Sequence, residues 1–132
     1  MKANIHKVGI IILVLFFTLL FVNCKWKSDL DNQITIKINS IDEKSKKRRI
    51  HMFDTVEVRK EGFGWLMKTF NVVGVYRTDS TGSVKIKIDS TKIIEISVKG
   101  LHELGGDMYY PGYLKNNQEV DIEVRSYKEY WE

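Results

Sequence analysis

Hydrophobic and polar residues alternate one by one along much of the chain after residue 33, and this spacing predicts β-strands. Each run puts apolar side chains on one face and polar ones on the other, as in a sheet with one face in water. A less regular run at 70–78 has apolar groups on both faces, and Tyr113-Leu114 is expected to add a short seventh strand. The alternating runs are Ile34–Ile38, Val56–Arg59, Val84–Ile88, Ile94–Val98 and Val120–Val124.

Polar segments between these runs predict where the chain reverses. Thr78–Gly82 joins two runs and ends on a glycine, which adopts a positive φ without a steric penalty. Asp89–Thr91 and Asn116–Gln118 mark two further reversals. Short strands separated by turns at near-regular spacing predict an all-β domain over residues 34–132, an antiparallel β-sandwich of about seven strands.

The amino-acid composition also favours a sheet. Residues 24–132 contain 11 Ile, 9 Val and 6 Thr but only 5 Leu and 3 Met, and Ala is absent after residue 3. β-Branched side chains lose freedom in helices and fit pleated surfaces, whereas Ala is the best helix former. The length of 132 residues allows one domain, and 43% hydrophobic residues exclude a multi-spanning membrane protein and a long disordered chain.

The first 23 residues follow a different pattern. A short basic lead ending at Lys7 precedes a 15-residue stretch, Val8–Val22, which is apolar except for Gly9 and Thr18. This arrangement is typical of a secretory signal, because a membrane-spanning helix needs about 20 apolar residues. We therefore expect residues 1–23 to be a signal peptide, with an uncleaved signal anchor as the alternative.

The single cysteine, Cys24, directly follows this segment. An exported protein with one cysteine has no intrachain disulfide partner, so the thiol needs another role. The segment Phe21–Cys24 resembles the lipobox of bacterial lipoproteins, and with the following Lys25 it is similar to the relaxed boxes of Bacteroidota lipoproteins. The resemblance implies cleavage before Cys24 and acylation of that residue, and acyl chains contribute ~0.8 kcal/mol per buried methylene to a membrane anchor.

The lipoprotein resemblance also implies a location. An Asp after the acylated cysteine would favour inner-membrane retention in some bacteria, but Lys25 stands there, so we expect the outer membrane, on its periplasmic or its outer face. Residues 24–33 would then be a lipidated tether. The expected partners are the membrane, through the lipid anchor, and a protein or envelope polysaccharide; nucleic acid is not expected.

The order of strands and turns resembles a family of β-sandwiches. Thr78–Gly82, followed by the alternating strand after it, is similar to the T-D-x-x-G hairpin of prealbumin-like domains, which include carboxypeptidase regulatory-like and Cna B-type domains. Such domains are usually non-catalytic spacers or adhesion and assembly modules, so the resemblance implies a binding role. Transthyretin-like hydrolases share the fold but need a Tyr-Arg-Gly-Ser end and paired histidines; the end of this chain, 125–132, lacks that motif.

Few side chains are candidates for chemistry. A zinc site needs three or four nitrogen, sulfur or oxygen ligands at recognisable spacing, which the sequence does not contain, and no cofactor is expected. His102, Glu103 and Asp107 form the one local cluster, and a small exported enzyme that combines them with His51 is an alternative to a binding module. An ordinary exposed loop explains the same residues, so we expect no enzyme.

Two segments are candidates for contact with a partner. The net charge is +4, and the run at 44–49 holds five of the 21 Lys and Arg residues, so the rest of the folded domain is mildly acidic. This run could bind anionic envelope components, or it could simply be a solvated hairpin loop. The aromatic loop after Gly62 could contact a sugar or a protein, or it could close one end of the sandwich. The candidate surface residues are Lys44, Lys46, Lys47, Arg48, Arg49, Phe63 and Trp65.

Overall fold

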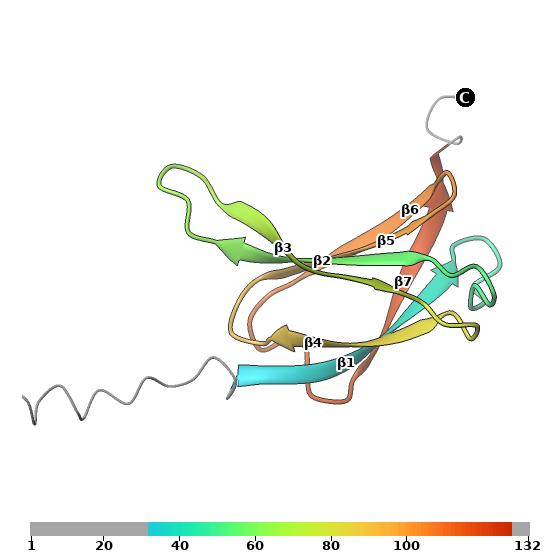
Figure 1. The fold of residues 1–132 in the computed structure, drawn as a ribbon, viewed down its shortest axis with the longest axis horizontal. Coiled ribbons are helices and arrows are strands. Elements are labelled where there is room, and N and C mark those ends of the chain that lie inside the picture. The colour runs from blue at the N-terminus through green and yellow to red at the C-terminus, as the bar shows by residue number, and fades with distance from the viewer. Residues whose placement is uncertain (1–31, 128–132) are drawn as a thin grey trace, which may run out of the picture. The chain divides into compact units, whose positions relative to one another are not determined.

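The computed structural model describes residues 32–127, which form an all-β domain (Figure 1). The expected signal peptide, Cys24 and nearly all of the expected tether lie outside the described residues. Branched residues with period-2 spacing form most of the strands, as the composition predicts. The strands are β1 (Gln33–Asp42), β2 (Thr55–Gly62), β3 (Thr69–Arg77), β4 (Ser83–Asp89), β5 (Ile94–Gly100), β6 (Glu103–Tyr109) and β7 (Glu119–Ser126).

The seven strands belong to one sheet that curls back on itself. The order is β3-β2-β5-β6-β7-β1-β4, and Figure 1 shows β2, β3, β5 and β6 in one layer, β1 and β4 in the other, and β7 passing between them. The two edge strands, β3 and β4, also contact each other, so the sheet is nearly closed into a barrel. The all-β class and the number of strands are confirmed. A uniformly antiparallel arrangement is wrong, because β1 and β7 run parallel from Lys37↔Glu119 to Asp42↔Val124.

Six of the expected strands are present, but the seventh lies elsewhere. Tyr113-Leu114, expected to be a strand, lies outside the strands, in the turn-rich connection between β6 and β7. His102 lies in the two-residue turn that pairs Gly100 with Glu103, as expected for a loop residue, but Glu103 and Asp107, also expected in that loop, lie in β6. Two adjacent glycines remove the hydrophobic alternation from β6, and pairing along its whole length with β5 gives it its strand conformation.

Branched side chains from both layers fill the interior. Ile36 and Ile38 of β1 face Val56 of β2 and Ile96 of β5 across the core, and all four have no exposed surface. Burial of each such side chain is worth about 1.5–3 kcal/mol relative to leaving it in water. The core therefore lies between the layers, and the charged faces of the strands point outward, as the alternation predicts.

The tripeptide Asp-Ser-Thr stands at each end of β4 and forms the turn there. The Asp79 carboxylate accepts hydrogen bonds from the backbone N–H and hydroxyl of Thr81, at 2.8 and 2.6 Å. Asp89 accepts the same pair from Thr91, at 3.0 and 2.6 Å. Gly82 has the expected positive φ, 75°. These turns confirm the reversals expected at 78–82 and 89–91 and give β4 defined ends.

Candidate functional site

Strands β6 and β7 pair over only two residues and then separate. Their ladder consists of Glu103↔Ser126 and Leu104↔Arg125. Beyond Leu104, β6 continues to Tyr109 with β5 as its one partner strand, while β7 pairs with β1 on its other side. Among residues 32–127, the facing edges of β6 and β7 beyond this point are therefore unpaired, and the barrel wall is open between them.

Gly105 lies where the two strands separate. A Cβ at this position would overlap the carbonyl oxygen of Glu123 and would lie 2.8 Å from its carbonyl carbon, so only glycine lets β6 pass this close to β7. The next residue, Gly106, is less crowded, because the atom nearest to an added Cβ would be the carbonyl oxygen of Ile96 at 3.1 Å. Neither residue places a side chain over the opening.

A groove of about 830 Å³ follows the opening across β5, β6 and β7. Leu104, Met108 and Ile122 supply apolar parts of its lining. Among the described residues that line it, most of the charged ones are acidic, and Arg125 is the one basic residue. The five carboxylates are those of Glu43, Glu95, Asp107, Asp121 and Glu123.

The groove carboxylates differ in their partners. Glu123 pairs with Lys46 Nζ at 2.7 Å, and Glu95 lies 3.8 Å from an Arg59 nitrogen. Asp107 makes no ion pair with any described residue; it accepts the backbone N–H of Met108 at 2.8 Å. Burial raises the pKa of Tyr109, and the Asp107 charge and their hydrogen bond raise it further. Tyr109 therefore stays protonated at neutral pH.

The basic run turns back on the end of β1, where Arg48 pairs with Ile41, and it is not a hairpin loop between β1 and β2. β1 and β2 are not neighbours in the sheet, so the segment 43–54 crosses from one layer to the other. Lys46 pairs with Glu123 at 2.7 Å, and Arg48 pairs with Glu119 at 3.2 Å, both on β7. Lys44 and Lys47 are exposed. Arg49, also a candidate surface residue, is buried, with 6% of its surface exposed, and is not part of that surface.

Arg49 is the centre of a buried ion cluster. Its Nε donates to Asp54 Oδ2 at 2.9 Å, and one of its terminal nitrogens donates to Glu103 on β6. Asp54, 2% exposed, also accepts the Ser40 hydroxyl of β1 at 2.6 Å. The hydrogen bonds that Arg49 donates to Asp54 and Glu103, the one to Asp54 above all, raise the pKa of Arg49. The cluster ties the crossing segment to strands of both layers.

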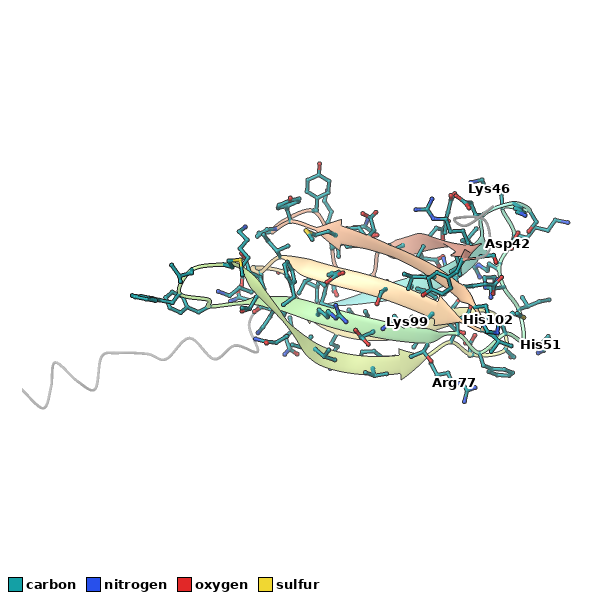
Figure 2. All side chains as sticks on the ribbon, turned by 90° about the horizontal axis from the view of Figure 1, so that it is seen from above. Asp42, Lys46, His51, Arg77, Lys99 and His102 are labelled. Carbon is teal, nitrogen blue, oxygen red and sulfur yellow. The ribbon has the colours of Figure 1, made fainter. Side chains whose placement is uncertain are left out.

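The structure separates the residues of the expected catalytic loop. His51 and His102 are exposed and lie at the same end of the barrel (Figure 2), each with a positive φ, 57° and 60°. Glu103 binds Arg49, and Asp107 lies four residues along β6 in the groove, which neither histidine lines. In residues 32–127, no three His, Cys, Asp or Glu side chains are grouped to hold a metal ion.

The aromatic loop between β2 and β3 points into solvent. Phe63 is 97% exposed and Trp65 is 90% exposed. The interpretation that they close one end of the core is therefore wrong. The loop lies at the end of the barrel opposite His51 and His102 (Figure 2).

The sequence matches no protein-family model, and it has no significant match among curated proteins. Within residues 32–127, none of the structure is a helix with the length and apolar character needed to cross a membrane.

Proposed function

We propose that this chain is a membrane-anchored lipoprotein of the bacterial cell envelope, and that its domain is a non-catalytic binding module of the prealbumin-like sandwich type. The anchor is supported by the apolar stretch Val8–Val22 directly before Cys24. The binding site is the groove between β6 and β7, and its ligand is an extended, positively charged segment of a protein partner.

The separation of β6 from β7 carries this proposal. An unpaired strand edge offers a row of backbone donors and acceptors to which an extended segment can add as a further strand. Beyond the close contact of Gly105 with Glu123, the β6 edge from Gly106 to Tyr109 has room for about four residues of such a segment. Backbone hydrogen bonds would supply affinity, while the neighbouring carboxylates of Asp107 and Glu123 would favour cationic side chains.

The two alternative functions have less support. An enzyme built on His102 would need its partners in one pocket, but Glu103 is held by Arg49 and both histidines lie outside the groove. A basic-loop binder of anionic envelope components would need free cations. Two cations of that run, Lys46 and Arg48, are paired with carboxylates of this domain.

The anchor is tested by the intact mass and membrane partition of the chain. We expect wild-type protein in the detergent fraction to have the mass of residues 24–132 plus acyl chains. Cys24→Ser should lose that mass increment and its lipidation-dependent retention. A Cys24→Ser protein that stays fully membrane-bound would overturn lipidation, and an uncleaved mass for the wild type would favour the signal anchor.

The groove is tested with a synthetic peptide of alternating Lys and Val, eight residues long, against a matched Glu-Val peptide. With the full chain in a non-ionic detergent, we expect the Lys-Val peptide to bind and to slow hydrogen exchange at Gly106 and Met108. Salt should weaken binding because the charges are exposed. Equal binding of both peptides, or unchanged exchange at both amides, would contradict the proposal.

Charge-removing variants locate the binding of this peptide. Asp107→Asn and Glu123→Gln should each lower its affinity by about two- to fivefold, as expected for exposed charge pairs. Glu57→Gln is the matched control, because Glu57 pairs with Lys99 at 3.0 Å on the outer face of β2 and β5 and does not line the groove. An equal loss in the control would mean that the peptide responds to overall charge and not to the groove.

A further inference from the structure

The loop between β2 and β3 exposes four large apolar side chains within five residues, and the fifth residue is a glycine. Phe63, Trp65, Leu66 and Met67 are 97%, 90%, 85% and 79% exposed. No residue from 63 to 67 is charged. The loop is also tightly turned, because a Cβ at Gly64 would overlap the carbonyl oxygen of Met67. A continuous apolar tip of this kind on a soluble domain marks a contact with a membrane or a partner.

The chain enters the domain beside the base of this loop. Lys60, near the end of β2, has its Nζ 3.7 Å from Asp89 Oδ2, and Asp89 is the register partner of Gln33 at the start of β1. The backbone N–H of Ser90 donates to the carbonyl of Asn32 at 3.1 Å. The first described residues and the loop therefore lie at one end of the barrel, and Figure 2 shows His51 and His102 at the other.

The length of the preceding segment limits how far this end can be from the membrane. Eight residues lie between Cys24 and Gln33, so the chain takes nine Cα–Cα steps from one to the other. A fully extended chain spans at most about 3.6 Å per residue, so an anchor at Cys24 keeps the start of β1 within about 30 Å of the membrane. The proposed anchor therefore keeps a lipid surface within reach of the end of the barrel that carries the exposed loop.

We propose that Phe63, Trp65, Leu66 and Met67 insert into the interfacial region of the membrane that holds the anchor. This inference rests on the membrane attachment proposed above. Trp is suited to the boundary between headgroups and acyl chains, and apolar side chains without charges enter that region readily. The loop is then a second contact that orients the barrel, with the end that carries His51 and His102 directed away from the membrane.

The test keeps Trp65 as the single tryptophan of the chain and measures how deeply it enters the membrane. The full chain with Trp26→Phe and Trp131→Phe retains Trp65 alone. It is expressed with its signal and reconstituted into phosphatidylethanolamine–phosphatidylglycerol vesicles that contain brominated lipid. We expect the Trp65 emission to shift to shorter wavelength and to fall at least twofold relative to vesicles without bromine.

A matched control moves the tryptophan to the opposite end. Adding Trp65→Phe and Leu101→Trp places the probe in the β5–β6 turn, where Leu101 is already 83% exposed, and this probe should not be quenched. Circular dichroism confirms that both proteins are folded. Vesicle-bound protein with unquenched Trp65 would overturn loop insertion and leave the anchor standing. Protein that does not sediment with the vesicles would overturn the attachment and, with it, this inference.

Discussion

The buried position of Arg49 makes a strong prediction about stability. Arg49→Met removes the cation while keeping most of the apolar stem. Glu103, whose side chain is 24% exposed, can turn towards water, but Asp54 is 2% exposed and stays in the interior. The loss of stability therefore comes mainly from the Asp54 carboxylate, which stays buried without its cation and keeps the hydrogen bond from the Ser40 hydroxyl at 2.6 Å.

The expected loss is large for a domain of this size. Removing one partner of a buried ion pair costs about 3–5 kcal/mol, because the remaining charge is left uncompensated. Domains are stable by about 5–15 kcal/mol, so this change removes a third or more of a typical value. At roughly 4–8 °C per kcal/mol for about 100 residues, the Tm should fall by about 20 °C.

Urea unfolding at pH 7 measures this loss, and two further variants show its origin. Arg48→Met is the matched control, because Arg48 is 40% exposed and makes one ion pair with Glu119, which is worth about 1 kcal/mol or less. Arg49→Met combined with Asp54→Asn should recover part of the loss, since the amide carries no charge. A loss below about 1 kcal/mol for Arg49→Met, equal to that of the control, would refute the reasoning.

Two further predictions concern the strand separation and the first turn. Gly105→Ala should destabilise the domain by about 1–3 kcal/mol or push β6 away from Glu123, whereas Gly106→Ala should cost less than about 1 kcal/mol. Urea unfolding measures both free energies. Equal costs for the two variants would contradict the close approach at Gly105. The Thr81 hydrogen bond keeps the pKa of Asp79 below its ordinary 3.8, so Asp79 adds stability above about pH 4 that is lost as the pH falls further. Thr81→Val should raise that pKa, which NMR titration measures, and an unchanged pKa would show that the hydroxyl is not responsible.

The strands that alternate in sequence were predictable, because their apolar residues enter the core at every second position. Ile34–Ile38 and Ile94–Val98 lie within β1 and β5, as expected. β6 could not be predicted in this way, since Gly105 and Gly106 interrupt any alternation and the strand depends on pairing with β5. Its pattern resembles a loop because glycine is common in loops and rare in strand interiors.

The candidate site was harder to predict than the strands, because it depends on contacts between distant residues. The parallel pairing of β1 with β7 joins positions about 80 residues apart and determines where β7 leaves β6. Arg49 stands in a run of five basic residues, and nothing local distinguishes the buried one from the exposed ones. The exposure of Trp65 could not be predicted for a related reason, since an apolar loop can pack inward or point outward with the same sequence.

The distribution of charge favours an apolar contact over a charged one for the proposed orientation of the domain at the membrane. Lys46 and Arg48 lie against carboxylates of β7, and the domain outside the basic run is mildly acidic. Such a domain gains little from attraction to an anionic membrane, because polybasic surfaces provide that attraction. Orientation would therefore depend on Phe63–Met67. With that loop at the membrane, β6 would run from its polar start at Glu103 towards the membrane at Tyr109, and a partner strand would enter the groove from the side.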